Sequence, residues 1–168
     1  MSEVFINKVA ESGIVTLNLE DFYPKENIEL FDLKDFLFMG LILKEKEFRT
    51  ALQNIDWGIY KNKIIGITCT TDAIIPVWAY MLVASYLQPE ALYVSTGDKE
   101  TITHQLLLQR IDNINPQDYT DKRVVIKGCG DIAIPALAYT AITFKLKPVV
   151  KSIMYGEPCS TVPIYKRK

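Results

Sequence analysis

The chain uses one pattern of residues twice, at a spacing of 59 residues, and this repeat constrains the fold more than any other feature. Without a gap, Lys61–Pro76 (KNKIIGITCTTDAIIP) aligns with Thr120–Pro135 (TDKRVVIKGCGDIAIP), and 12 of the 44 positions from Ile55 to Asp98 are identical in the second copy. Each copy reads as an apolar strand, a polar loop, a helix that starts with proline, and another apolar strand. A repeat of this length is one supersecondary unit. The sequence therefore predicts an α/β fold in which internally duplicated βαβ units form a mostly parallel sheet.

The repeat also predicts where the elements lie. The expected strands are 63–68, 91–95, 122–127 and 149–154, and the expected helices are 75–87, 99–112 and 134–146. The strands are apolar and β-branched without strict alternation, which is typical of strands covered on both faces. Right-handed crossovers then place helices on both faces of the sheet.

A length of 168 residues, with 49% hydrophobic and 23% charged residues, suits one domain with a sizeable core. We expect a single α/β domain over 1–168 that begins with a strand and helix extension. Its parts are the N-terminal extension (1–57), repeat one (58–98), a linking helix (99–113), repeat two (114–157) and a C-terminal tail (158–168). Within the extension we expect a strand over 14–19, a helix from Asp32 or Asp35 to about Gly40, and a helix over 45–55.

Charge and hydropathy exclude several classes of partner. The net charge of −1 gives no basic surplus for nucleic acid. The longest apolar stretch, Ile74–Leu87, is too short to cross a bilayer. The first residues lack a positive region followed by an apolar run, so we expect a cytoplasmic protein whose cysteines are thiols. The oligomeric state stays open.

Three cysteines carry the functional prediction. Cys69, Cys129 and Cys159 each follow an expected strand, and the carboxyl ends of parallel strands meet at one sheet edge. We therefore expect the three thiols at one edge, with Cys69 and Cys129 on neighbouring strands. Asp72 lies three residues beyond Cys69. Thiolates with a carboxylate suit zinc or an iron–sulfur cluster, so the predicted metal site contains Cys69, Cys129 and Cys159, with Asp72 as fourth ligand or as an acceptor behind the ligands.

Two other classes of function stay open. One cysteine could be the nucleophile of a thiol enzyme. Alternatively, the protein is a scaffold in which the cysteines only pack as small apolar residues. Whether the chain is an enzyme is not decided by the sequence. Asp72 and Asp131, at matched positions, could also simply cap the two helices.

Two further motifs point less clearly to a site. The pattern Gly128-x-Gly130-x-x-Ala133 matches a dinucleotide-binding loop, but Asp131 would place a negative charge among phosphates, and repeat one has no glycines there. His104 is the only histidine. It falls on the expected helix 99–112, more than one turn from the edge with the cysteines, and we expect it to be an ordinary helix residue.

Four stretches carry a resemblance to a known family: VAESGIVTLNLEDFYP (9–24), ITCTTDAIIPVWAYM (67–81), VVIKGC (124–129) and VVKSIMYGEPCSTVPIYKRK (149–168). At these residues the chain resembles the bacterial family called domain of unknown function 2480. The resemblance implies no assigned activity. It implies that all three cysteines belong to the family pattern, whereas the residues after Cys129 do not. It also associates the chain with iron–sulfur assembly of the sulfur-mobilisation type, which implies a cluster as cofactor and assembly proteins as partners.

Overall fold

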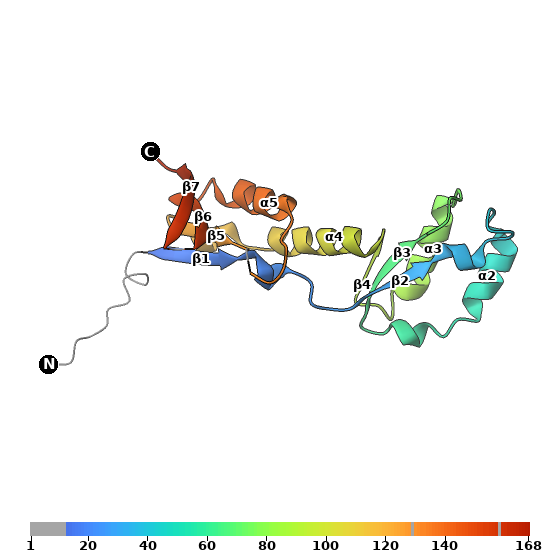
Figure 1. The fold of residues 1–168 in the computed structure, drawn as a ribbon. Helices are drawn as coiled ribbons and strands as arrows, with labels where there is room; N and C mark the ends of the chain where they lie inside the picture. Colours follow the sequence, from blue (N-terminus) through green and yellow to red (C-terminus); the bar gives the residue numbers. More distant parts are fainter. Residues whose placement is uncertain (1–12, 129, 158) are drawn as a thin grey trace. The chain divides into compact units, whose positions relative to one another are not determined.

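The computed structural model describes residues 13–128, 130–157 and 159–168 (Figure 1). The chain divides into two compact units. Lys25–His104 form the first, here called the central unit, and Gln105–Lys168 join the segment that ends at Pro24 in the second, here called the terminal unit. None of the described helices is long and apolar enough to cross a membrane. The α/β class is confirmed, with strand–helix–strand units and mostly parallel strands.

The central unit is built on a three-stranded parallel sheet of order β2-β3-β4. Its elements are β2 (Ile28–Asp32), η2 (Leu33–Phe36), α2 (Glu45–Gln53), η3 (Trp57–Tyr60), β3 (Ile64–Thr68), α3 (Val77–Leu87), β4 (Tyr93–Thr96) and the start of α4 (Lys99–Asp112). The first four residues of the central strand β3 are buried. The core joins Ile65 and Ile67 of this strand to Val83 and Leu87 of α3 and to Phe48 of α2.

The terminal unit is built on a four-stranded sheet of order β1-β5-β6-β7, in which only β7 is antiparallel to its neighbour. Its elements are β1 (Ile14–Asn18), η1 (Leu19–Phe22), the end of α4, η4 (Pro116–Tyr119), β5 (Arg123–Lys127), α5 (Ala136–Leu146), β6 (Ser152–Glu157) and β7 (Ser160–Lys166). Val124 and Ile126 of β5 pack with Ile142 and Leu146 of α5 and with Ile111 of α4.

The predicted duplication is confirmed element by element. The paired elements η3 and η4, β3 and β5, α3 and α5, and β4 and β6 each begin 59 residues apart. Asn62 (φ 59°) and Asp121 (φ 58°) adopt the same left-handed conformation at matched positions. Gly97 and Gly156 also share a positive φ, of 137° and 116°. Because even these unusual backbone conformations repeat, the two copies share one local fold.

The two repeats lie in two sheets, whereas the sequence predicts one. Each repeat receives a further parallel strand from the N-terminal region: β2 pairs with β3, and β1 pairs with β5. With a partner on both sides, neither β3 nor β5 has a free edge for the other. β1 and β2 are themselves alike, because each runs into a short 3-10 helix capped by its last side chain, Asn18 in one case and Asp32 in the other.

Two further expectations differ from the structure. Asp32–Gly40 is not a helix: Asp32 ends β2, and after η2 a tight hairpin pairs Phe38 with Ile42. Gly40 has a φ of 70°, which an α-helix does not contain. The expected tail contains β7, which pairs with β6. After β7, the guanidinium of Arg167 donates hydrogen bonds to the carbonyls of Val149 and Val150.

Candidate functional site

Each repeat carries a polar loop between its first strand and its helix, at the carboxyl edge of its own sheet. In the central unit, Asp32 fixes this loop. Its Oδ1 accepts hydrogen bonds from the amides of Lys34 (3.0 Å) and Thr70 (3.1 Å), and its Oδ2 accepts one from the Thr70 hydroxyl. The end of β2 therefore positions the loop that follows β3.

The charge of Asp32 is stabilised by these contacts. Burial by itself would raise the pKa of this carboxyl group. The hydrogen bonds from Thr70 and from the Lys34 amide, together with the positive charge of Lys34, more than offset that effect and hold the pKa below its usual value of 3.8. Asp32 is thus a carboxylate in the folded protein at neutral pH, and it acts as a structural acceptor at this edge.

Cys69 is the first residue after β3 and is half-buried. Its Sγ lies 3.6 Å from the backbone oxygen and 3.5 Å from the hydroxyl of Thr71. Burial, and after it the negative charge of the Cys69 thiolate, raises the pKa of Tyr80 above its usual value. The thiol therefore sits between its own loop and the first turns of α3, with hydroxyl groups as neighbours.

The terminal unit has glycine where the central unit has Cys69. A side chain at Gly128 would begin 2.5 Å from the hydroxyl oxygen of Tyr139, which is the repeat partner of Tyr80. The tyrosine hydroxyl thus lies close to the backbone in one unit, and a thiol fills the matched position in the other. The cysteine of the central unit has no counterpart in the repeat at that position.

Asp72 is exposed and lies in the loop before α3. The alternative in which Asp72 and Asp131 cap the helices is wrong. The N-cap positions of α3 and α5 are Pro76 and Pro135, and neither has a side-chain cap hydrogen bond. The role of Asp72 as a metal ligand stays a prediction.

Cys159 is exposed and lies in the connection between β6 and β7. Because β5 and β6 are parallel neighbours, the segments that follow them begin at the same sheet edge. Lys127 at the end of β5 and Glu157 at the end of β6 form an ion pair of 3.3 Å across this edge. Cys129, which comes two residues after β5 in the sequence, lies outside the described residues.

The expectation that Cys69 and Cys129 follow neighbouring strands of one sheet is wrong, because β3 and β5 belong to different sheets. The sequence shows that each cysteine follows a strand. It does not reveal that β2 pairs with β3 and β1 pairs with β5, which puts β3 and β5 in separate sheets. Within the described ranges, no group of three His, Cys, Asp or Glu residues is close enough together to hold a metal ion.

The glycine pattern in repeat two does not form a phosphate-binding loop. The backbone amide of Gly130 donates a hydrogen bond to the carboxylate of Glu20, on η1. The Glu20 carboxylate therefore occupies the backbone N–H donor that a bound phosphate would need, and its negative charge would repel a phosphate. His104 lies on α4 with its Nε2 4.0 Å from Glu100 of the same helix, as expected of an ordinary helix residue.

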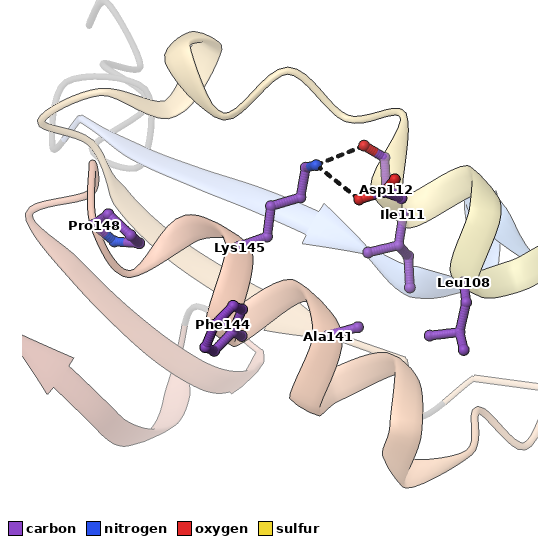
Figure 2. Close-up of a pocket in the computed structure, with 7 residues that line it drawn as sticks. All are labelled: Leu108, Ile111, Asp112, Ala141, Phe144, Lys145 and Pro148. Atoms are coloured by element: carbon purple, nitrogen blue, oxygen red, sulfur yellow. Dashed lines mark hydrogen bonds and ion pairs between the residues drawn. The ribbon is translucent and has the colours of Figure 1, made fainter.

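Two pockets of the terminal unit were not expected from the sequence. Figure 2 shows the first, lined by Leu108, Ile111, Asp112, Ala141, Phe144, Lys145 and Pro148. Its only charged groups are already engaged, because the Lys145 ammonium group contacts both the backbone oxygen and the carboxylate of Asp112. The remaining lining is apolar, so this pocket offers no unengaged charged group that would orient a substrate.

The second pocket lies beside the edge that carries Cys159. It is lined by Ile126, Tyr139, Thr143, Ile153, Met154, Tyr155 and Ile164. The rings of Tyr139 and Tyr155 meet edge to face, with centroids 5.6 Å apart. This apolar wall adjoins Gly128 through the Tyr139 hydroxyl.

Sequence reasoning missed the groups that hold the two loops, Asp32 and Glu20, and the Lys127–Glu157 pair. One signal was present. The segments that start at Ile14 and Ile28 both read as a strand, a polar cap, Leu, a charged residue, Asp and Phe. This second repeat, at a spacing of 14 residues, would have indicated that Asn18 and Asp32 play matched roles.

The fold and its two edges define a class: an internally duplicated α/β protein whose two units each present a loop at the carboxyl edge of a parallel sheet. The chain belongs to the family described as protein of unknown function (DUF2480), which matches residues 3–167. No curated protein and no solved structure matches it.

Proposed function

We propose that this protein binds either a metal ion, namely zinc, or an iron–sulfur cluster, and that cysteine thiolates are the ligands. The candidate ligands are Cys69, Cys129 and Cys159, with the carboxylate of Asp72 as a further donor. One observation carries the proposal: the Cys159 thiol is exposed at the carboxyl edge of the four-stranded sheet. Cysteine is among the most buried residue types, so an exposed cysteine at an edge that gathers ligand sites favours chemistry over packing.

The proposal depends on Cys129. No three potential ligands gather among the described residues, and a structural zinc site needs four ligands. Cys129 follows β5 as Cys159 follows β6, and these strands are parallel neighbours. The two thiolates would be held near 2.3 Å from a zinc ion in such a site.

The contacts of Cys69 give less support to a thiol enzyme. A nucleophilic cysteine needs a base within hydrogen-bond reach. The described contacts of the Cys69 sulfur are with the hydroxyl and carbonyl oxygens of Thr71, and neither group is a base that would take its proton. These contacts therefore do not support Cys69 as the nucleophile of an enzyme.

We further propose a cytoplasmic location and a link to iron–sulfur assembly proteins. Cys69 and Cys159 are both free thiols, which is typical of a reducing compartment. The link to assembly proteins rests on the resemblance alone. Cell fractionation tests the location, and co-purification with cysteine desulfurase or scaffold proteins under anaerobic conditions tests the link.

The experiment that tests the proposal is a set of single substitutions purified without oxygen and assayed for zinc, iron and sulfide. Cys129→Ser and Cys159→Ser should each lose most of the bound metal, because each removes a ligand. Cys69→Ser and Asp72→Asn report whether the loop of the central unit also supplies ligands. Asp131→Asn is the matched control, because Asp131 occupies the repeat position of Asp72 and is exposed in the same way.

Metal content decides the outcome, since serine in place of a packed cysteine also destabilises a protein. The proposal is wrong if Cys129→Ser and Cys159→Ser hold as much metal as the unsubstituted protein. A bound metal also stabilises the native state by mass action. A chelator should therefore lower the melting temperature of the unsubstituted protein and leave that of Cys129→Ser unchanged.

A further inference from the structure

Six of the large apolar side chains that the central unit exposes are here called the apolar patch: Met39, Leu41, Ile42, Ile74, Val77 and Met81. Between 60% and 93% of the surface of each is exposed. The hairpin and the loop before α3 lie together, because Leu41, Ile42 and Ile74 line one shallow pocket. Val77 and Met81 extend this surface along α3, one helical turn apart.

The second repeat shows that the fold does not require these side chains. The positions that match Ile74, Val77 and Met81 are Ala133, Ala136 and Thr140, and all three are exposed in the terminal unit as well. The helices α3 and α5 have matching bounds, offset by 59 residues, so the same backbone forms in the terminal unit with small residues at these three positions. Large apolar side chains at exposed positions that the fold leaves free point to a binding surface.

The hairpin adds a second observation. Met39 has a φ of 53°, in the left-handed region that costs a residue with a side chain about 1–2 kcal/mol. The other described left-handed residues that are not glycine, Asn62 and Asp121, are of types that tolerate this conformation. Met39 gains no burial in exchange, because 80% of its surface is exposed. A strained apolar residue at the tip of an exposed hairpin is typical of a contact that forms in a complex.

We propose that the apolar patch is the interface of a homodimer, in which two copies of this chain pack their central units against each other. Six aliphatic side chains at about three-quarters exposure together present on the order of several hundred Å² of apolar surface, the size of a patch that marks an interaction site. One partner of a standard protein interface buries about 800 Å². The patch thus supplies a large part of that area as the apolar core of the interface, and the polar residues around it supply the rim.

The chemistry of the patch favours a second copy over other occupants. Homodimer interfaces are more apolar than interfaces between separate proteins, and none of the six side chains is charged. An apolar surface is complementary to itself across a two-fold axis, because apolar contacts have no direction. An anionic lipid surface would select an excess of basic residues around the patch. Both signs of charge border it, because Asp72 lines the shallow pocket and the Lys44 ammonium group lies over the ring of Phe38 on the hairpin.

The test is sedimentation equilibrium of the full chain over a range of concentrations. The unsubstituted protein should show twice the chain mass of 19.1 kDa. The variant Ile74→Ala, Val77→Ala, Met81→Thr carries the residues of repeat two and should raise the dimer dissociation constant at least about 10- to 100-fold. Met39→Gly provides a second test, because it removes apolar contact and relieves the left-handed strain, so weaker association cannot be attributed to unfolding.

The matched control is Phe144→Ser. Phe144 is also highly exposed, on α5 of the terminal unit, and its partner in repeat one is Ser85. This variant should dimerise like the unsubstituted protein. The proposal is overturned if the unsubstituted chain stays monomeric up to about 100 μM, or if the triple variant associates as tightly as the unsubstituted chain. If Phe144→Ser alone dissociates the dimer, the interface lies on the terminal unit and the proposal is wrong. If the protein is a monomer that sediments with phosphatidylcholine vesicles, the patch binds a lipid surface and the proposal is also wrong.

Discussion

Gly66 lies in the middle of the central strand of the three-stranded sheet, at a point where other backbone approaches closely. A Cβ atom at this position would lie 2.9 Å from the carbonyl oxygen of Gly97 and 3.0 Å from Ile102 on α4. The matched residue of repeat two is Val125, which is fully buried. In β5 this strand position therefore accepts a side chain. In β3 the close contacts with Gly97 and Ile102 exclude a side chain at Gly66.

Gly66→Ala should destabilise the central unit. Forcing a methyl group into a packed site costs about 1–3 kcal/mol, and the reduced freedom of the unfolded chain returns about 0.4–1 kcal/mol. We expect a net loss of about 1–2 kcal/mol in the free energy of unfolding. For a chain of this size, this corresponds to a fall of roughly 2–8 °C in the melting temperature.

Urea unfolding followed by circular dichroism measures this change. Gly58→Ala is the matched control, because the atom nearest to its added Cβ, at 3.1 Å, is the carboxylate oxygen of the exposed Asp56 side chain. This oxygen accepts a hydrogen bond from the Gly58 amide, and a shift of a few tenths of an ångström makes room for the methyl group. We expect Gly58→Ala to change the stability by less than about 0.5 kcal/mol. A Gly66→Ala protein as stable as the unsubstituted one would refute the packing argument.

Two further predictions concern the carboxylate of Asp32 and the matched buried leucines of the two cores. The folded-state pKa of Asp32 is below its unfolded value of 3.8. The stability that its carboxylate contributes is therefore present above about pH 4 and is lost as the pH falls through the lower, folded-state pKa. Asp32→Asn should remove this part of the acid dependence in urea unfolding at pH 2–6; an unchanged pH profile would contradict it. The matched core residues Leu87 and Leu146 are fully buried, so Leu87→Ala and Leu146→Ala should each cost about 2–5 kcal/mol. Amide exchange should increase mainly in the unit that carries the substitution, and an equal increase in both units would count against two separate cores.

The duplication could be predicted from the sequence because it rests on residues with local meaning. Pro76 and Pro135 mark the starts of helices, and Gly97 and Gly156 supply positive φ at the end of the second strand of each repeat. These roles depend on the backbone around each residue, so they can be read without knowledge of the tertiary structure.

The division into two sheets could not be predicted in the same way. It depends on β1 pairing with β5 across more than 100 residues, and on β2 taking the matched place beside β3. Strand pairing of this kind is set by packing between distant segments, and the five residues of β2 form a strand by pairing with β3. The tail was misread for a similar reason, because β7 becomes a strand only by pairing with β6.

The candidate site was predictable only as a set of residues. Sequence order places each cysteine after a strand, but the sheet to which that strand belongs decides its neighbours. Cys159 lies at the edge that β5 and β6 share, while Cys69 lies at the edge of the other sheet. The repeat at a spacing of 14 residues indicates Asp32 as a cap matched to Asn18, but the tertiary hydrogen bonds of Asp32 and Glu20 to the loops depend on distant segments that this repeat does not reveal.

The most direct test of the account is the metal and sulfide content of the unsubstituted protein, purified without oxygen, together with its absorption spectrum. Thiolate ligation predicts a zinc or iron content that is a fixed proportion of the protein. For a cluster, it also predicts acid-labile sulfide and visible absorption that disappears in air. A protein that holds no zinc, iron or sulfide, and melts at the same temperature with and without a chelator, would contradict the proposed function.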